Sequence, residues 1–204
     1  MTNSPDTRIC FVGDSFINGT GDRECLGWTG RVCAAACRQG YNVTYYNLGI
    51  RRETSADIRD RWQAEVERRL PASCDRRVVF SFGVNDTTIE QGRRRVESRD
   101  SVENARQILT QAKRSLSVLM VGPALVAEAA QNQRILDLSV RLVALCQELE
   151  VPFLAIAERL QASTVWIPEA IANDGAHPGA AGYGELAKLV RGWGAWQGWF
   201  PARS

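Results

Sequence analysis

Short apolar runs alternate with longer segments of helical period along the chain. Runs with the length and composition of buried strands occupy residues 8–12, 43–48, 77–82, 117–121 and 152–156. Between them, apolar side chains recur every three or four positions, which predicts helices over 28–38, 55–70, 101–115, 132–148 and 180–193. Strands that alternate with helices in this way build parallel sheets. The pattern therefore predicts an α/β fold, a three-layer α/β/α sandwich around a mostly parallel five-stranded sheet.

This order continues without an internal repeat, a low-complexity tract or a linker rich in Pro, Gly and Ser. A chain of 204 residues with 45% hydrophobic content is long enough to bury one full core. We expect a single domain over residues 1–204.

The charge and hydropathy of the chain argue against two classes of partner, nucleic acids and membranes. Twenty-five Lys and Arg against 23 Asp and Glu give a net charge of +2, which does not indicate a nucleic-acid partner. The first six residues are polar, and no stretch approaches the roughly 20 apolar residues that a membrane span needs. We expect a cytoplasmic protein with no membrane span and no nucleic-acid partner.

Six cysteines are scattered over the chain, a spacing that favours reduced thiols over a disulfide framework. Cys33 and Cys37 lie one helical turn apart, but no C-x-x-C pattern or nearby histidine completes a metal site. We expect both thiols to pack in the core and no metal to bind.

The only histidine of the chain is His177, in the run Asp174-Gly175-Ala176-His177-Pro178. Imidazole is the side chain whose unperturbed pKa lies near neutrality, so His177 is the candidate proton carrier. Asp174 can hold one tautomer of the imidazole and stabilise the imidazolium. Taken alone, the pair is more simply a capped turn beside a half-exposed histidine.

Three glycine-containing loops follow the first three predicted strands, and in a parallel sheet such loops meet at one crevice. Ser15, in Gly13-Asp14-Ser15, is a candidate nucleophile, although such a turn is usually only a turn. Gly49 allows close backbone approach, and Asn85 offers an amide that can donate to a developing oxyanion. Together with the Asp-x-x-His unit, these residues are difficult to explain as turns.

At these residues the chain resembles the SGNH, or GDSL-type, esterase and lipase family. Four blocks carry the resemblance, in the family's order: Phe11-Val12-Gly13-Asp14-Ser15, Asn47-Leu48-Gly49, Gly83-Val84-Asn85-Asp86 and Asp174-Gly175-Ala176-His177-Pro178. The resemblance implies a flavodoxin-like SGNH hydrolase fold without a metal or cofactor.

Carried over residue by residue, the resemblance implies that Ser15 is the nucleophile, His177 the base and then the acid, and Asp174 its orienting carboxylate. The Ser15 and Gly49 N–H groups and the Asn85 amide would form the oxyanion hole. The implied reaction is hydrolysis of a small-molecule carboxylic ester through an acyl-enzyme on Ser15, with short-chain acyl or acetyl esters as the expected class. Lysophospholipid, thioester and carbohydrate O-acetyl substrates remain open alternatives.

Two interpretations without catalysis compete with the esterase interpretation. In the first, a flavodoxin-like domain binds a phosphate on the turn that holds Ser15, which leaves Asn85 and the Asp174/His177 pair without a task. In the second, the fold serves as an interaction module, with Trp193, Trp196 and Trp199 as its contact surface.

These three tryptophans recur every three residues, a spacing that predicts a stripe on one side of a helix. Core packing is the simpler interpretation of the stripe. The alternative is a surface through which the chain forms a homo-oligomer.

The chain departs from the family at Arg52, where members often have a second glycine three residues after Gly49, and Arg51 precedes it. The two guanidinium groups either bind an acidic group of the substrate or pair with a structural carboxylate such as Glu53 or Asp57. We favour the second interpretation, pairing with a carboxylate of the protein. A further run, Arg93–Arg95, follows the Asn85 block. We interpret it as a solvated face, with a substrate lid as the alternative.

Overall fold

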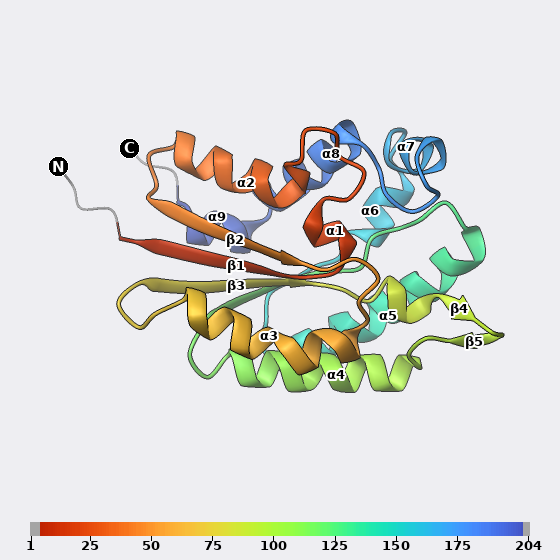
Figure 1. Ribbon diagram of the computed structural model, residues 1–204, viewed down its shortest axis with the longest axis horizontal. Helices are drawn as coiled ribbons and strands as arrows, with labels where there is room; N and C mark the ends of the chain where they lie inside the picture. The colour runs from red at the N-terminus through yellow and green to blue at the C-terminus, as the bar shows by residue number, and fades with distance from the viewer. Residues whose placement is uncertain (1–4, 202–204) are drawn as a thin grey trace.

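A parallel five-stranded sheet forms the centre of the molecule. The computed structural model describes residues 5–201. The sheet consists of β1 (Thr7–Gly13), β2 (Val43–Gly49), β3 (Asp75–Ser81), β6 (Ser117–Val121) and β7 (Phe153–Leu154). Their order is β2-β1-β3-β6-β7 (Figure 1). The predicted α/β fold is confirmed. Strands β2 and β3 lie on opposite sides of β1, so the strand order reverses between β1 and β3. Folds of this kind bind their ligands at such a switch point.

The helices are α1 (Ser15–Asn18), α2 (Gly27–Arg38), α3 (Ser55–Arg69), α4 (Ser98–Ala112), α5 (Ala129–Glu148), α6 (Ala157–Gln161), α7 (Trp166–Ala172), α8 (Ala180–Arg191) and α9 (Gly194–Trp199). A 3₁₀ turn, η1 (Asn85–Thr87), and a hairpin of β4 (Ile89–Glu90) and β5 (Arg93–Arg94) follow β3. All five predicted helices are present. Helices α4 and α5 begin three residues earlier than predicted, because the added residues include no large apolar side chain that could show the period. Helix α4 also ends three residues earlier than predicted, and α8 ends two residues earlier.

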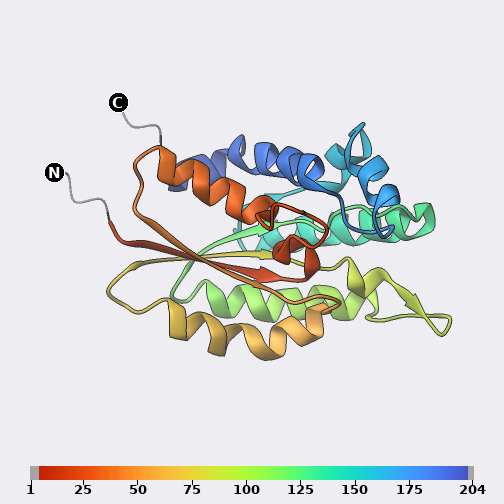
Figure 2. The same cartoon turned by 45° about the horizontal axis from the view of Figure 1, so that its top comes forward.

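Helices cover both faces of the sheet, and alternate residues of β1 enter two cores. Ile9 and Phe11 point into the core under α2 and α8, while Cys10 and Val12 point into the core over α3 and α4. Figure 2 shows α2 and α8 on one side of the sheet and α3 and α4 on the other. Helix α5 contributes to both cores, so the three predicted layers are present.

The C-terminal tryptophans do not form one helical stripe, because α8 ends at Arg191 and Trp193 stands before α9 as its N-cap. Trp196 is 4% exposed, while Trp193 and Trp199 are partly buried against the same core. The guanidinium of Arg77 lies 5.2 Å from the Trp199 ring centre. Core packing is thus confirmed, and self-association stays a prediction.

The expectation for the cysteine pair is right for Cys33 and wrong for Cys37. Cys33 is 2% exposed in the core under α2, whereas Cys37 is exposed. The last turn of α2 buries Ala36 in place of Cys37. Within residues 5–201, no helix is long and apolar enough to cross a membrane.

Candidate active site

Ser15 stands just past the carboxyl end of β1, on a turn whose first residue must be glycine. A Cβ at Gly13 would lie 1.9 Å from the carbonyl oxygen of Ser81 on the neighbouring strand. Asp14 then caps α1, because its Oδ1 accepts the N–H of Phe16 at 3.0 Å. Ser15 is the first residue of α1, so its own N–H has no acceptor within the helix.

Asp14 is buried without a full set of partners. Its side chain is 1% exposed, and its Oδ2 has no hydrogen bond among residues 5–201. Burial raises the pKa of Asp14 to about 7, and the nearby carboxylates of Asp86 and Glu53 act in the same direction against the Phe16 N–H. A carboxyl group that titrates near neutrality therefore lies directly beside the candidate nucleophile.

The loop between α7 and α8 forms a compact unit around its aspartate. Asp174 Oδ1 accepts the N–H groups of Ala176 at 3.0 Å and His177 at 2.9 Å. Its Oδ2 lies 2.7 Å from His177 Nδ1. The other ring nitrogen, Nε2, lies 2.7 Å from Ser15 Oγ. The structure thus places all three residues in hydrogen-bonded contact, in the order that the resemblance implies.

Charge and burial set the tautomer of the imidazole. Partial burial disfavours the charged form of Asp174, but the hydrogen bonds from the His177 backbone and ring and from Ala176 outweigh it and lower the pKa of Asp174 to about 2. An ionised Asp174 requires a proton on Nδ1 of His177. The 7% exposed His177 therefore presents an accepting Nε2 to the Ser15 hydroxyl.

The candidate oxyanion donors differ in how they are placed. Asn85 begins η1, and its Nδ2 donates to the carbonyl oxygen of Glu53 at 2.9 Å, which leaves its second amide hydrogen. Gly49 ends β2, and its N–H donates to Asn47 Oδ1 at 3.0 Å. A Cβ at Gly49 would lie 2.2 Å from the Asn18 nitrogen, so close packing on α1 alone requires glycine there.

A cavity of about 370 Å³ lies over the serine. Of the residues proposed from sequence, its wall includes Ser15, Arg51, Arg52, Asn85, Asp174 and His177. Gly49 is not part of the wall, and its N–H donates to Asn47 Oδ1. The four blocks converge on one edge of the sheet, where Gly49 packs against α1.

The favoured interpretation, a pair with a structural carboxylate, is right for Arg52, although the two carboxylates named for it are wrong. Arg52 Nη2 lies 2.9 Å from Glu90 Oε1, not beside Glu53 or Asp57. Glu53 is bound by Arg61 at 2.6 Å, and Asp57 closes the capping box at the start of α3. Since both carboxylates are already engaged, Arg52 reaches across to the hairpin.

Within the Arg93–Arg95 run, Arg93 faces solvent and Arg95 faces the cavity. Arg93 is exposed on β5, as predicted for a solvated face. Arg95 lines the cavity, and its Nη1 donates to the carbonyl oxygen of Arg52 at 2.7 Å. The interpretation as a solvated face is therefore wrong for Arg95, because the hairpin turns this end of the run toward the β2–α3 loop.

Sequence reasoning missed several residues of the cavity wall. The Phe16 ring centre lies 5.0 Å from that of His177, and its place directly after Ser15 was a usable signal. Gln131 is 8% exposed, and its Nε2 donates to the Val84 carbonyl oxygen at 3.1 Å. Gln131 and its neighbour Glu128 belong to no motif, so nothing in the sequence marked them.

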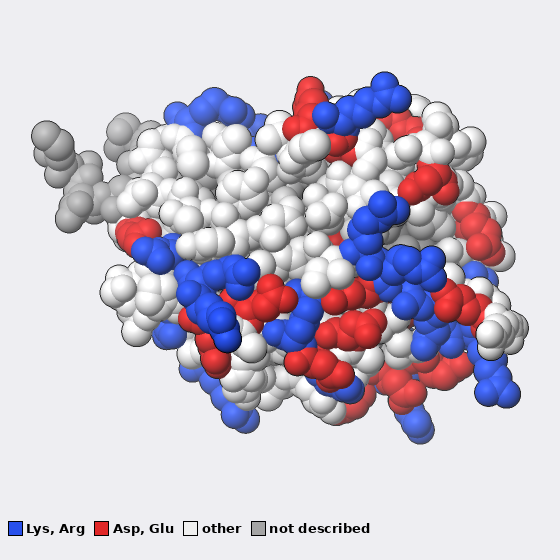
Figure 3. All heavy atoms as spheres, in the orientation of Figure 1, with Lys and Arg blue, Asp and Glu red and all other residues white. Residues whose placement is uncertain are grey.

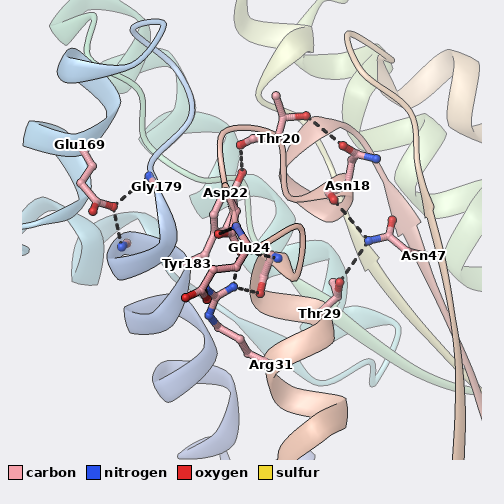
Figure 4. A network of polar contacts seen from close by, with 12 residues as sticks. Asn18, Thr20, Asp22, Glu24, Thr29, Arg31, Asn47, Glu169, Gly179 and Tyr183 are labelled. Atoms are coloured by element: carbon pink, nitrogen blue, oxygen red, sulfur yellow. Dashed lines mark hydrogen bonds and ion pairs between the residues drawn. The ribbon is translucent and has the colours of Figure 1, made fainter.

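The loop after α1 packs against the histidine loop, which fixes the two halves of the site relative to each other. The Tyr183 hydroxyl donates to the Thr20 carbonyl oxygen at 2.8 Å, and a Cβ at Gly21 would lie 3.1 Å from His177 Cβ. Buried Asp22 closes this loop by accepting from Arg31 and from the Gly27 N–H (Figure 4).

Figure 4 also shows Glu169 of α7 at the start of α8. Its Oε2 accepts the N–H groups of Gly179 at 2.9 Å and Gly182 at 2.7 Å. Asn173 Nδ2 donates to the His177 carbonyl oxygen at 3.1 Å. These contacts fix both ends of the loop that holds His177.

Comparison with solved structures finds the same fold in known hydrolases. The acetylxylan esterase Axe2 of Geobacillus stearothermophilus superimposes with a TM-score of 0.75 at 19% identity, over 96% of this chain and 98% of that one. The lipase/acylhydrolase of Enterococcus faecalis gives a TM-score of 0.77 at 19% identity, over 97% and 99%. A comparison with curated proteins finds no match.

The match to a protein family identifies the chain. The model of the GDSL-like lipase/acylhydrolase family matches residues 11–184, a range that contains all four blocks. The family resemblance seen in the sequence is confirmed. The chain belongs to the GDSL-like lipase/acylhydrolase family and is a hydrolase that cleaves ester bonds.

Proposed function

We propose that Ser15, His177 and Asp174 are the catalytic triad of this hydrolase, and that it cleaves a short-chain acyl or acetyl ester through an acyl-enzyme on Ser15. One observation carries the proposal. His177 lies 2.7 Å from Ser15 Oγ through Nε2 and 2.7 Å from Asp174 Oδ2 through Nδ1. This is the hydrogen-bonded chain that a serine nucleophile requires.

In the acylation step, Ser15 Oγ forms a bond to the ester carbonyl carbon while its proton passes to His177 Nε2. The carbonyl oxygen becomes an oxyanion. When the tetrahedral intermediate collapses, the carbon–oxygen bond to the alcohol breaks, and the leaving oxygen takes the proton from Nε2. Asp174 keeps Nδ1 protonated and stabilises the transient imidazolium, which its lowered pKa favours.

Deacylation repeats these transfers with water. His177 Nε2 removes a proton from the water as its oxygen bonds to the acyl carbon, and collapse breaks the bond to Ser15 Oγ. The proton on Nε2 returns to that oxygen. The product is a carboxylic acid, and Ser15 and His177 recover their starting forms.

The oxyanion needs donors that face the carbonyl oxygen. The Ser15 N–H has no acceptor within α1, and Asn85 Nδ2 has a second hydrogen beyond its bond to Glu53. Gly49 is the third donor of the proposed oxyanion hole, in which role its N–H is shared between Asn47 Oδ1 and the oxyanion. Removal of one such donor from other hydrolases typically lowers kcat by about 100- to 1000-fold.

The small, charged cavity supports a short acyl group. Its volume is about 370 Å³, and Arg51, Arg52, Arg95, Glu90 and Glu128 all contribute to its wall. A long hydrocarbon chain gains free energy mainly from apolar surroundings, at about 0.8 kcal/mol for each buried CH₂ group. The apolar side chains of the wall are Phe16, Val84, Val126 and Ala176, which suffice for a short acyl group but not for a long hydrocarbon chain.

The fold neighbours add support for the triad. Substitutions of one serine, one aspartate and one histidine of Axe2 are each described as catalytic mutants, with the aspartate three positions before the histidine. Asp174 and His177 have the same spacing. Axe2 is an acetylxylan esterase, so a carbohydrate O-acetyl ester is the second candidate substrate. Lysophospholipids and thioesters fit the same chemistry.

Covalent labelling tests the nucleophile. A fluorophosphonate probe followed by intact mass measurement and peptide mapping should give one adduct, on Ser15, and none in Ser15→Ala. Labelling of another residue in active protein would contradict the assignment. A panel of p-nitrophenyl esters from acetate to palmitate, run beside acetylated xylo-oligosaccharides, a lysophospholipid and an acyl thioester, then ranks the substrate classes.

A further inference from the structure

We propose that Arg51 and Arg52 form an anion-binding subsite beside Ser15, so that the enzyme prefers esters whose acyl or alcohol part carries a carboxylate or phosphate group. This inference rests on the function proposed above and specifies its substrate class. A guanidinium presents a planar fork of donors that matches both kinds of anion.

Both arginines line the cavity in which we propose that the substrate binds. They belong to the loop between β2 and α3, and they line the cavity that also contains Ser15 and His177. Basic side chains gather over this loop and the β4–β5 hairpin, on the right-hand side of Figure 3. A negative group attached to a bound ester is therefore within the same cavity as the two guanidinium groups.

The acidic residues of the cavity wall already have basic partners. Glu90 Oε1 lies 2.9 Å from Arg52 Nη2 and 3.6 Å from Arg95 Nε. Glu128 Oε1 lies 3.5 Å from Arg134 Nη2. These carboxylates are therefore neutralised by neighbours and do not cancel the charge of a further cation.

Arg51 is that further cation. Within residues 5–201, its side chain has no ion pair and no hydrogen bond. The one remaining carboxylate of the wall, Asp174, directs its oxygens to His177 and to the Ala176 N–H. The wall that contains Ser15 and His177 thus also contains a guanidinium without an ion-pair partner.

The loop that carries the arginines is held in place before any ligand arrives. Asn85 Nδ2 donates to the Glu53 carbonyl oxygen at 2.9 Å, and the Ser55 N–H donates to Asp86 Oδ1 at 2.7 Å. Arg95 Nη1 holds the Arg52 carbonyl oxygen at 2.7 Å. A preorganised site spends less binding free energy on ordering the loop.

Arg52 occupies a backbone position that suits glycine. Its φ is +66°, in the left-handed region that side chains with a Cβ disfavour. Its ion pair with Glu90 does not account for an arginine here, because the Arg52 side chain is 76% exposed and such pairs contribute little. The anion of a substrate can take the place of Glu90 on this guanidinium.

Matched ester pairs test the preference on each side of the ester. On the acyl side, the mono-p-nitrophenyl ester of glutaric acid is compared with p-nitrophenyl pentanoate. On the alcohol side, 4-acetoxybenzoate and 4-acetoxyphenyl phosphate are each compared with 4-acetoxybenzamide. These arms separate acyl from alcohol recognition and carboxylate from phosphate. For each pair, the measured quantity is the selectivity, the ratio of the anionic to the neutral kcat/KM.

Arg51→Gln should lower the selectivity on at least one pair by about 10- to 100-fold, the range for a lost hydrogen bond to a charged group. The loss should come mainly from a higher KM, because a bond to an anion away from the reacting carbonyl stabilises the bound substrate and the transition state equally. Arg51→Lys should retain part of the selectivity, since it keeps the charge without the fork. Arg52→Gly removes a guanidinium and also suits the positive φ, so a loss of selectivity in this variant cannot come from new backbone strain.

Arg93→Gln is the matched control. Arg93 is exposed on the same hairpin as Arg95 but does not line the cavity, so it contributes to the field of the surface and not to the subsite. Its selectivity should equal that of the wild type.

Unchanged selectivity in both Arg51→Gln and Arg52→Gly, with normal hydrolysis of the neutral esters, overturns the subsite and leaves the proposed function intact. An equal loss in Arg93→Gln overturns it too, because the effect then belongs to the general surface charge. If the wild type hydrolyses none of these esters, the proposed function fails and the subsite fails with it.

Discussion

His177 Nε2 lies 2.7 Å from Ser15 Oγ although 162 positions separate the two residues in the chain. The contact depends on tertiary packing, in which the loop after α1 is tied to α8 by the Tyr183–Thr20 hydrogen bond. The contact between His177 and Asp174 is local by comparison, since it closes within one loop. The proton path of the proposed mechanism therefore joins the local pair of Asp174 and His177 to a nucleophile that is far away in the sequence.

Because this path works as one unit, its members should not contribute additively. Ser15→Ala and His177→Ala should each lower kcat by several powers of ten, and the double variant should be hardly less active than either. Steady-state kinetics on p-nitrophenyl acetate checks this. A His177→Ala variant that retains more than about a tenth of the wild-type kcat is incompatible with a general base, which typically contributes 10²- to 10⁴-fold.

Asp174→Asn tests the orienting carboxylate. An amide at this position can hold the wrong imidazole tautomer, and kcat should fall by up to roughly 10⁴-fold, the magnitude known for the equivalent change in a serine-protease triad. Circular dichroism should show an unchanged fold, because an asparagine oxygen can still accept the N–H groups of Ala176 and His177. Near-normal kcat in a folded Asp174→Asn variant would remove Asp174 from the mechanism.

Asn85→Ala should lower kcat by about 100- to 1000-fold and leave KM for a neutral ester within a few-fold, because an oxyanion donor acts mainly in the transition state. Asn104→Ala is the matched control. Asn104 is a buried asparagine that, like the partly buried Asn85, donates near the start of α3, to Ser55 Oγ at 2.9 Å, but it does not line the cavity. A similar loss of kcat in both variants would indicate damage to α3 and not a lost donor.

The sequence predicted the parts of the fold that have a clear period. The strand at 117–121 matches β6 residue for residue, and α2 and α3 each agree within one residue. Their signals are buried β-branched runs and apolar stripes. The elements α1, α6 and η1 were not predicted, since segments of three to five residues are too short to show a period.

The candidate site was predictable where one short motif carries it and not where packing assembles it. The contact between Asp174 and His177 follows from their spacing. The partner of Arg52 does not, because Glu90 reaches it only through the β4–β5 hairpin, which no period indicated. Gln131 enters the cavity from α5, and only the packing of that helix brings it there.

Asp14→Asn should stabilise the protein more at pH 8 than at pH 5. An asparagine caps a helix as well as an aspartate does, so the bond to the Phe16 N–H is kept. Burial raises the pKa of Asp14 from 3.8 to about 7, so the folded state holds its proton while the unfolded state releases it. The wild-type stability that depends on this group is complete below pH 4 and is lost as the pH rises through 7.

Urea denaturation of both proteins at the two pH values measures this effect, and titrations common to both proteins cancel in the difference. The gain from Asp14→Asn should be larger at pH 8 by about 3 kcal/mol, the value of two titrated pH units at 1.36 kcal/mol each. An equal gain at both pH values would show that Asp14 titrates in the ordinary range.

Glu169 should act as a positioning residue for His177 without touching a substrate. Its Oε2 accepts the N–H groups of Gly179 and Gly182, and the N-cap residue of α8, Gly179, has no side chain with which to cap the helix. Glu169→Ala should therefore destabilise the fold by about 1–2 kcal/mol, the range for a lost helix cap. It should also lower kcat for a neutral ester with little change in KM, because a displaced imidazole impairs proton transfer more than binding. Glu169→Gln, which keeps an accepting oxygen, should restore most of both losses.

Glu185 of α8 offers the control, since its carboxylate binds Ser163 Oγ away from the histidine loop. If Glu169→Ala loses stability but keeps full kcat well below its unfolding temperature, as Glu185→Ala should, then Glu169 supports the fold and has no part in placing His177.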